Sequence, residues 1–367
     1  MKHKFNLLII TPTYLPAYHI GGPIFQISKL SNHLFEKKIG HKILSTKNSF
    51  NKGGKKNNKT IYFKSYLGKL YFSLELIFFL LKEIKKYDKV YIISCFNFFS
   101  LFSAVICFIF NKQYFISPRG SLMKESINFK SRSIKKLWIF LFEKRILEKA
   151  KKVIFSSKFE QEETKKIIDI KNNTIISNFL TIKPYKNKNK NKILNSILFL
   201  GRITEKKNID KIIYAFKNEF NFKIKIVGSG KKKYINFLKK IIDKKQLKNK
   251  IHILPATYNE KVKRTLFKEA RFSILLSATE NFGNTILESL LCRTPVIISK
   301  NTGLSNFIKK KKVGIICGDN ISKLSNLYKK IDSGFNVKIS KKTHKEILDI
   351  FDNKKIMKKY FKLFDIK

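Results

Sequence analysis

The sequence predicts an α/β protein of two domains, each a doubly wound parallel sheet covered by helices. Short apolar runs alternate with longer amphipathic segments, which is the pattern of βαβ units around a parallel sheet. The pattern occurs twice, before and after a polar stretch at residues 183–192. The chain has 367 residues, of which 43% are hydrophobic, so it is too long for one ordinary core and too apolar for a disordered chain.

The first domain is expected at residues 1–183. Its buried strands are predicted where short apolar runs are bounded by polar or turn residues, at residues 5–10, 89–93, 113–116 and 152–155. Apolar residues at helical spacing predict the helices between them, at residues 23–38, 98–110, 134–149 and 158–168. Pro184 and the alternating Lys and Asn of residues 183–192 predict a linker after this domain.

The second domain is expected at residues 193–349. The same criteria predict six strands, at residues 196–200, 222–227, 251–254, 272–276, 295–298 and 313–316. Gly228-Ser229-Gly230 follows the second of these strands and is interpreted as a turn. Helical spacing continues over residues 341–364, and we expect the last helix, about residues 350–367, to pack back on the first domain.

The chain is strongly basic, with a formal net charge of +53 from 78 Lys and Arg against 25 Asp and Glu. Seven of the 78 are Arg, so 71 are Lys, and they are spread along the whole chain. Two interpretations stay open: the Lys-rich surface of a chain from an AT-rich genome, or a positive field that favours an anionic membrane surface. Nucleic acid is not expected as a partner, because the basic residues do not cluster with aromatic residues on one element.

The apolar stretches and the cysteines indicate in which cellular compartment the protein is expected. The longest strongly apolar stretch, residues 96–110, is shorter than the roughly 18 residues that span a bilayer, and residues 1–4 do not resemble a secretory signal. The cysteines have no CxxC spacing and suit free thiols in a reducing compartment; they are Cys95, Cys107, Cys292 and Cys317. We expect a cytoplasmic protein, with a peripheral place on the inner face of the cytoplasmic membrane.

The loop after the strand at residues 196–200 carries cations beside the start of the next helix. It reads Gly201-Arg202-Ile203-Thr204-Glu205-Lys206-Lys207. The free backbone N–H groups and the dipole at a helix N-terminus favour an anion, and Arg and Lys strengthen that preference. This loop is predicted to bind a diphosphate, with surface solvation as the alternative for its lysines.

The loop after the strand at residues 272–276 carries two carboxylates around a glycine turn. Glu280 follows the strand, Glu288 lies eight residues later inside the next helix, and the residues at the start of that helix are Phe282, Gly283, Asn284 and Thr285. An early carboxylate suits sugar hydroxyls, the helix-opening amides suit a diphosphate or sugar, and the later carboxylate suits both hydroxyls of a ribose. The arrangement predicts a sugar nucleotide as ligand.

These motifs resemble those of the family-4 retaining glycosyltransferases. Glu280 to Glu288 resembles the E-x7-E motif of that family, and Gly201-Arg202 with Lys207 resembles its donor-phosphate motif. Thr11-Pro12 followed by Gly21-Gly22-Pro23 resembles its first glycine-rich loop, and Pro118-Arg119-Gly120 resembles a segment of members that build bacterial surface polysaccharides. The resemblance implies a GT-B fold, in which two Rossmann-like domains face a cleft.

The resemblance also implies roles for individual residues. Arg202 and Lys207 would bind the donor diphosphate, Glu288 the ribose, and Glu280 the donor sugar. The backbone at Phe282, Gly283, Asn284 and Thr285 would bind sugar and phosphate. Gly21 and Gly22 would let the backbone approach the cleft, and Arg119 would bind an acceptor or donor anion unless it is a structural arginine. The sequence departs from the family at Asn208, where Gly is usual, and at residues 94–97, where no His is present.

The expected reaction is transfer of a sugar, with retention, from a nucleoside diphosphate sugar to a glycan or lipid-linked acceptor of bacterial lipopolysaccharide, capsule or exopolysaccharide synthesis. No metal and no cofactor are expected, because the sequence has no DxD motif and no His/Cys/Asp cluster with ligand spacing. Whether Glu280 acts as a nucleophile or only stabilises charge stays open. The alternatives are a sugar-nucleotide-dependent synthase or phosphorylase of the same fold and a basic nucleic-acid-binding protein.

The segment at residues 132–152 is relevant to whether the acceptor is linked to a lipid. Residues 132–152 combine Trp138, Phe140 and Phe142 with lysines and arginines, as in a basic amphipathic helix that lies on anionic lipid. The same apolar side chains suit packing on the sheet, so both interpretations stay open.

Overall fold

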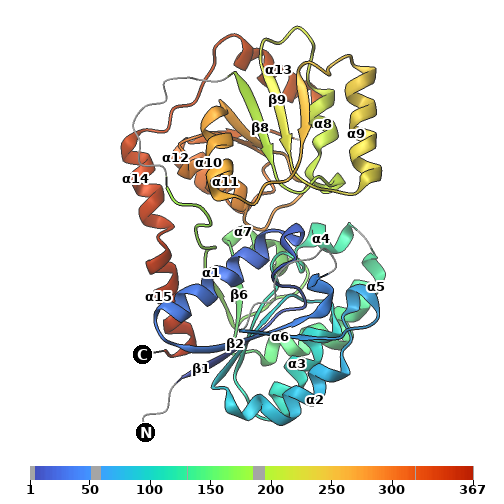
Figure 1. The fold of residues 1–367 in the computed structure, drawn as a ribbon, viewed down its shortest axis with the longest axis vertical. Coiled ribbons are helices and arrows are strands. Elements are labelled where there is room, and N and C mark those ends of the chain that lie inside the picture. Colours follow the sequence, from blue (N-terminus) through green and yellow to red (C-terminus); the bar gives the residue numbers. More distant parts are fainter. Residues whose placement is uncertain (1–4, 51–58, 130, 185–194, 319, 367) are drawn as a thin grey trace. The chain divides into compact units, whose positions relative to one another are not determined.

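The computed structural model describes residues 5–50, 59–129, 131–184, 195–318 and 320–366. The chain forms two compact units, Met1–Phe179 with Asn353–Lys367 (unit 1) and Leu180–Asp352 (unit 2) (Figure 1). Each unit is a parallel sheet covered by helices, as the alternating pattern predicts. Most of the stretch predicted as a linker, residues 185–192, lies outside the described residues.

The sheet of unit 1 has seven strands in the order β3-β2-β1-β4-β5-β6-β7. Neighbouring strands run parallel; Leu7, for example, lies opposite His41 on one side and Lys89 on the other. The strands are β1 (Asn6–Ile10), β2 (Gly40–Thr46), β3 (Thr60–Phe63), β4 (Lys89–Ile93), β5 (Tyr114–Ser117), β6 (Lys152–Phe155) and β7 (Asn173–Ile175). The four predicted strands are present, whereas β2, β3 and β7 were not predicted.

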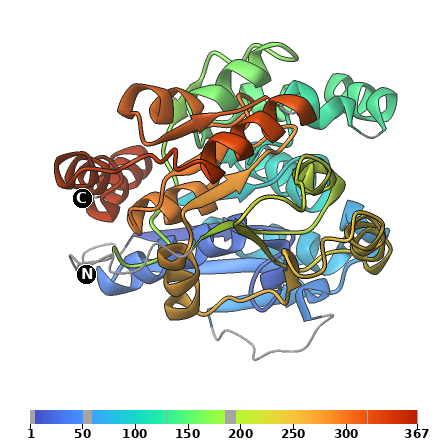
Figure 2. The same cartoon turned by 90° about the horizontal axis from the view of Figure 1, so that it is seen from above.

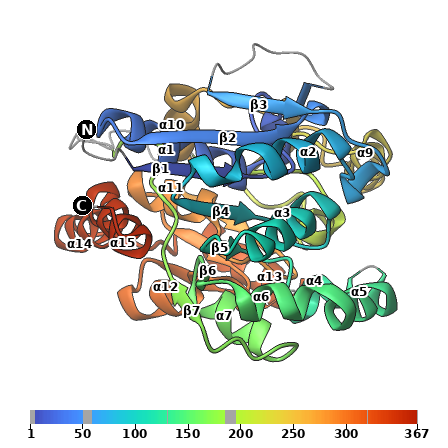
Figure 3. The same cartoon turned by 90° about the horizontal axis from the view of Figure 1, so that it is seen from below.

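Helices cover both faces of this sheet. Alternate residues of each strand point to opposite faces, and in β1 both sets are apolar, so each face needs a cover of helices. Leu7 and Ile9 share a core with α1 (Gly22–Glu36) and α15 (Asn353–Phe364). Leu8 and Ile10 share a core with α2 (Leu74–Glu83), α3 (Phe98–Ile109) and α6 (Lys144–Lys149), which lie side by side in Figure 3. The remaining helices are α4 (Lys124–Asn128), α5 (Arg132–Trp138) and α7 (Lys158–Lys165).

Two predicted helices are interrupted. The helix expected at residues 134–149 consists of α5, a π-helical turn at Ile139–Glu143 and α6. The helical pattern at residues 341–364 consists of α14 (Lys341–Ile350) and α15, because Phe351 leaves the helix and packs against Phe282 and Phe307 in unit 2. The last helix, α15, belongs to unit 1.

The sheet of unit 2 has six strands in the order β10-β9-β8-β11-β12-β13. They are β8 (Ser196–Leu200), β9 (Lys223–Val227), β10 (Ile251–Leu254), β11 (Phe272–Leu275), β12 (Val296–Ile298) and β13 (Gly314–Ile316), and each coincides with a predicted strand. The helices are α8 (Ile209–Tyr214), α9 (Lys232–Lys244), α10 (Glu260–Glu269), α11 (Asn284–Leu291), α12 (Ser305–Lys311), α13 (Ile321–Asp332) and α14 (Figure 2).

Strand β8 is buried on both sides. Ile197 and Phe199 lie in one core with side chains of α8 and α9, and Leu198 and Leu200 lie in another with Phe267 of α10. None of the helices in the described part of the chain is long and apolar enough to cross a bilayer. The four cysteines are buried and none of them forms a disulfide.

Candidate functional site

The strand order of unit 2 reverses between β8 and β11. At such a reversal the connections leave toward opposite faces, and open α/β sheets bind ligands there, beside the carboxyl ends of the strands. The loops that follow these strands, residues 201–208 and 276–283, are joined by hydrogen bonds. The Asn208 side-chain amide donates to the Leu276 carbonyl at 2.8 Å, and the Ala278 N–H donates to the Lys206 carbonyl at 2.9 Å. The fold therefore brings the predicted phosphate loop and the predicted carboxylate loop together.

The loop after β8 lies tightly against the loop after β9. The Ile203 N–H donates to the Ser229 carbonyl at 2.8 Å, and Ile203 pairs with Gly230 in a short parallel bridge. A Cβ atom at Gly230 would lie 2.0 Å from the Ile203 carbonyl oxygen, and one at Gly228 would lie 1.8 Å from that of Gly201. Only glycine allows this approach, so Gly228 and Gly230 fix the path of the loop that carries Arg202.

The start of α8 explains the departure at Asn208. This residue has a left-handed backbone, with φ 50° and ψ 40°, which Asn adopts more readily than most side chains. Its side chain then adds the hydrogen bond to Leu276, which glycine cannot make. Asn208 therefore adopts a left-handed backbone that glycine also allows, and it adds a hydrogen bond between the two loops.

Lys207 and Glu280 form an ion pair where the two loops meet, and both side chains are largely buried. Burial alone would raise the pKa of the Glu280 carboxyl, but the Lys207 ammonium, together with Arg202 and Lys206, outweighs burial and holds this pKa below its ordinary value. Glu280 is therefore ionised at neutral pH. Its charge is balanced by cations that the sequence assigns to a diphosphate.

The backbone of Glu280 is fixed on its other side by the loop after β12. The Glu280 N–H donates to the Asn301 carbonyl at 2.9 Å, and the Gly303 N–H donates to the Glu280 carbonyl at 2.9 Å. Arg202 has a different character, because its side chain is exposed and no described residue is a hydrogen-bond or ion-pair partner of its guanidinium. The site thus combines a fixed carboxylate with a cation that faces solvent.

The first turn of α11 follows directly. Phe282 is buried and packs edge-on against Phe351, with ring centroids 6.1 Å apart, so its side chain belongs to the core and its backbone is what the site receives. Gly283 has φ 91°, a conformation that side chains disfavour. Helix α11 then starts at Asn284 and Thr285, whose side chains are half-buried, and the amides of a first helical turn lack intrahelical acceptors.

Glu288 lies one turn further along α11 and is almost fully buried. Its Oε1 atom accepts hydrogen bonds from the Thr181 hydroxyl and the Lys263 ammonium. Its Oε2 atom is buried without a hydrogen-bond partner among the described residues. Thr181 and Lys263 were not predicted, because a single Lys among 71 carries no signal and the partners lie 107 and 25 residues from Glu288.

The remaining predicted residues belong to unit 1 and lie at the carboxyl ends of its strands. Gly21 has φ 89° and caps α1, whose first residue is Gly22. Arg119 follows β5 and donates to the Asn178 side chain at 2.8 Å and to the Tyr91 hydroxyl at 3.1 Å. These partners are structural groups of unit 1, which favours the structural interpretation of Arg119.

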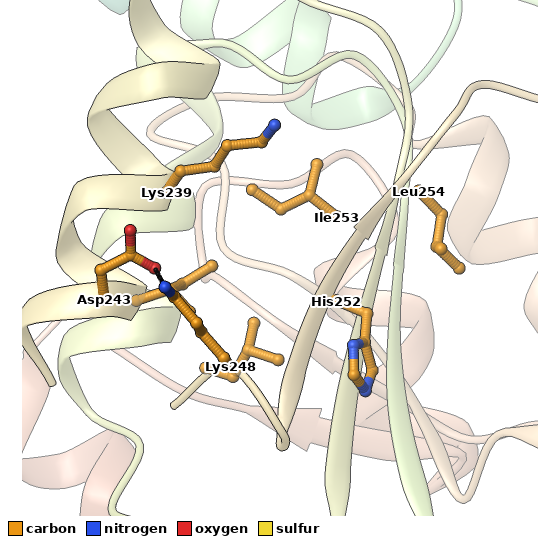
Figure 4. A pocket seen from close by; sticks show the side chains of 8 residues that line it. Lys239, Asp243, Lys248, His252, Ile253 and Leu254 are labelled. Carbon is orange, nitrogen blue, oxygen red and sulfur yellow. Dashed lines mark ion pairs between the residues drawn. The ribbon is translucent and has the colours of Figure 1, made fainter. Parts of the chain in front are cut away.

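No group of three or more His, Cys, Asp or Glu side chains suited to a metal ion occurs among the described residues. A separate hollow of unit 2 lies between α9 and the edge strand β10, where Lys248 and Asp243 form an ion pair of 3.4 Å beside His252 (Figure 4). Lys239 and four apolar side chains line the rest of this hollow, and none of the predicted site residues lies among its lining residues. It is therefore not the candidate site.

Comparison with known proteins identifies the sequence pattern of unit 2. Residues 182–345 match the family model described as "Glycosyl transferases group 1". The alpha-monoglucosyldiacylglycerol synthase of Streptococcus pneumoniae is 32% identical over 123 residues, which are 33% of this chain and 28% of that protein. The chain spans less than a third of the length of the first curated relatives that it matches.

Solved structures match over nearly the whole chain. A sucrose-phosphate synthase from Thermosynechococcus elongatus has a TM-score of 0.77 at 16% identity and covers 99% of this chain and 98% of its own. The Anabaena protein HepE, solved in complex with UDP-glucose, has a TM-score of 0.77 at 15% identity and covers 98% of this chain and 99% of its own. The two units therefore have the GT-B fold.

Proposed function

We propose that this protein transfers a sugar, with retention of configuration, from a nucleoside diphosphate sugar to a glycan or lipid-linked acceptor. The observation that carries the proposal is the meeting of Arg202, Lys207 and Glu280 at the strand reversal of unit 2, beside the first turn of α11. The match of residues 182–345 to group 1 glycosyl transferases supports it. The resemblance of the E-x7-E segment to family-4 retaining enzymes supplies the stereochemistry.

The donor diphosphate is assigned to Arg202, Lys207 and the amides at the start of α11. An ammonium group has several N–H donors, so the bond from Lys207 to Glu280 does not exhaust it. Arg202 is exposed and offers a planar pair of donors to phosphate oxygens. These groups stabilise the negative charge that develops on the leaving diphosphate, and each such donor typically contributes about 3 kcal/mol.

Glu280 is assigned to the donor sugar. Its backbone is held by Asn301 and Gly303, and its lowered pKa keeps the carboxylate ionised. A fixed negative charge stabilises the positive charge that develops on the sugar ring as the diphosphate leaves. Glu280, assigned to the sugar, and Lys207, assigned to the leaving diphosphate, form one ion pair. The groups on both sides of the bond that breaks are therefore held together.

Glu288 is assigned to the ribose. Thr181 and Lys263 both bind Oε1, which leaves the buried Oε2 atom as an acceptor. A ribose hydroxyl would satisfy this atom, because a buried carboxylate oxygen without a donor is costly.

The acceptor is proposed to belong to lipopolysaccharide, capsule or exopolysaccharide synthesis on the cytoplasmic side of the membrane. This rests on the resemblance of the segment around Arg119 to that of enzymes that build surface polysaccharides. A metal is proposed to be dispensable, because the cations of Arg202 and Lys207 serve the charge that a metal would otherwise balance.

A thermal-shift screen against UDP, GDP, ADP, CMP and their sugar conjugates tests the proposal. A ligand that binds only the folded state raises the melting temperature, so one nucleotide family is expected to stabilise the protein without metal. Arg202→Ala is expected to lose this shift, whereas Arg145→Ala, which removes an exposed arginine of unit 1, is expected to keep it. No shift with any nucleotide, or equal shifts in both variants, contradicts the proposal. A shift that appears only with added magnesium contradicts metal independence alone.

A further inference from the structure

Unit 1 exposes apolar side chains on a short hairpin after β3. The Tyr66 N–H donates to the Phe72 carbonyl at 2.7 Å and the Phe72 N–H to the Tyr66 carbonyl at 3.1 Å, which closes the hairpin around a 3-10 turn at Gly68–Leu70. Leu67 and Leu70 at its tip are exposed, Leu67 to 62%. This apolar hairpin, residues 66–72, buries neither leucine in the described structure.

A second apolar element is α5 with the π-helical turn that follows. Helix α5 has no buried residue at all, and Ile134, Leu137 and Phe140 are exposed to 69%, 57% and 74%. Core packing therefore does not explain Ile134, Leu137 and Phe140. The two interpretations of residues 132–152 both hold in part. Ile146 and Leu147 of α6 are buried against the sheet, and within residues 132–142, the apolar helix, Ile139 is buried in the same core while Trp138 packs against it. Ile134, Leu137 and Phe140 of the apolar helix remain exposed.

Aromatic side chains connect the two elements. Phe72 at the end of the hairpin contacts Phe98 of α3, with ring centroids 5.9 Å apart. Phe98 contacts Trp138 at 5.1 Å, and Trp138 contacts Phe142 at 5.2 Å. The apolar hairpin and the apolar helix are therefore parts of one continuous surface of unit 1.

The charged residues of the two elements themselves are all basic. Residues 64–72 and 126–142 contain no Asp or Glu. The basic residues Lys69, Arg132 and Lys136 are exposed among the apolar ones. A second copy of the chain would place like charges opposite each other in a two-fold interface, whereas an anionic lipid surface is complementary in charge and accepts apolar side chains.

We propose that the apolar hairpin and the apolar helix dock together on an anionic lipid bilayer. Leu67, Leu70, Leu137 and Phe140 enter the boundary between headgroups and acyl chains, and the neighbouring Lys and Arg bind lipid phosphates. The inference goes beyond sugar transfer and does not depend on the donor site, which lies in the other unit.

Sedimentation with vesicles tests this docking. The unchanged protein is expected to bind vesicles of phosphatidylcholine with phosphatidylglycerol, and to bind less at high salt or without phosphatidylglycerol. The double variants Leu67→Ser with Leu70→Ser, and Leu137→Ser with Phe140→Ser, are each expected to bind about tenfold more weakly or worse. Phe237→Ser removes an exposed aromatic residue of α9 in unit 2 and is expected to bind as the unchanged protein does.

Three results would overturn the docking proposal. The double variants bind vesicles as tightly as the unchanged protein, or binding ignores salt and phosphatidylglycerol. Alternatively, analytical ultracentrifugation without vesicles shows a dimer that the same substitutions dissociate, which assigns the surface to a second copy. The nucleotide shift of these variants is expected to be unchanged, so failure here and failure of the proposed transfer reaction are distinguishable.

Discussion

The pair of Lys207 and Glu280 is the residue-scale feature on which the proposed reaction depends. Two opposite charges 73 residues apart in sequence meet at the ends of two neighbouring strands. Each lowers the cost of burying the other, because an unpaired buried charge is expensive. The pair therefore stabilises the fold and holds an ionised carboxylate in place.

Acid should weaken this stabilisation in a defined window. An ordinary Glu has a pKa of about 4.3 in the unfolded chain, and the pKa of Glu280 in the folded protein is lower. The pair therefore contributes to the free energy of unfolding above about pH 4.3 and loses that contribution as pH falls through the folded-state pKa. Glu280→Gln lacks the contribution, so the difference in free energy of unfolding between the two proteins should be largest above about pH 4.3 and should shrink as pH falls below that value. Urea titrations at several pH values measure it, and a constant difference would contradict the account.

Substitutions of the two glutamates of the E-x7-E segment should affect different steps, Glu280 the rate of transfer and Glu288 the affinity for nucleotide. Glu280→Gln is expected to slow transfer about a hundredfold or more with little effect on nucleotide affinity, because it removes a charge used in the transition state. Glu288→Gln is expected to weaken nucleotide binding about tenfold to a hundredfold, because its amide replaces an acceptor of a charged hydrogen bond.

Gln is the informative substitution at position 288, since Glu288→Ala would also leave the half-buried Lys263 without its ion-pair partner and destabilise the fold. Titration of nucleotide and single-turnover transfer separate the two effects. Glu269→Gln is the matched control, because Glu269 pairs with Lys225 in the same unit outside the site. Identical behaviour of both glutamate variants and the control would exclude the assigned roles.

At the scale of elements, the loops after β8 and β9 are held together by the Ile203–Ser229 hydrogen bond and the Ile203–Gly230 bridge. Gly230→Ala would place a Cβ atom 2.0 Å from the Ile203 carbonyl oxygen, so the loop that carries Arg202 must move. We expect a loss of about 1–3 kcal/mol of stability and weaker nucleotide binding. Gly318→Ala, whose Cβ atom would have its nearest neighbour at 4.0 Å, should change neither. Calorimetric titration of both variants with nucleotide measures their affinities. Unchanged affinity in Gly230→Ala would contradict the role of Gly230 in positioning the loop that carries Arg202.

The predicted strands agree with the structure where the local apolar pattern of the sequence is strong. All six strands of unit 2 are short apolar runs and were predicted. In unit 1 the central strands were predicted, but β3 and β7 lie at the sheet edges and β2 starts with half-buried Gly40, His41 and Lys42. Such strands carry a weak apolar signal, because only one part of each faces a core.

The candidate site follows the same rule. Arg202, Lys207, Glu280 and Glu288 stand in local motifs, so their types and spacing are visible in sequence. The partners of Glu288 are not, because Thr181 and Lys263 reach it only through the tertiary fold. Arg119 has a motif, yet its hydrogen bonds to Tyr91 and Asn178 depend on packing that no spacing reveals.

At the scale of the whole molecule, the end of the chain completes the core of unit 1. Phe364 of α15 is fully buried and contacts Phe115 and Tyr91, with ring centroids 5.0 and 5.6 Å away. Phe364→Ala should cost about 3–5 kcal/mol and lower the melting temperature of unit 1. Lys362→Ala, an exposed change on the same helix, should not. Nucleotide binding by unit 2 should persist below the new transition, and its loss together with an unchanged melting temperature would contradict this division.

A nucleoside diphosphate is proposed to bind where β8 and β11 end in unit 2. Hydrogen–deuterium exchange of the unchanged protein, measured with UDP, GDP and ADP in turn, tests this binding site. One nucleotide is expected to slow exchange at residues 201–208 and 276–288 and to leave exchange in the hollow between α9 and β10 unchanged. Slowed exchange confined to other segments, or none with any nucleotide, would contradict it.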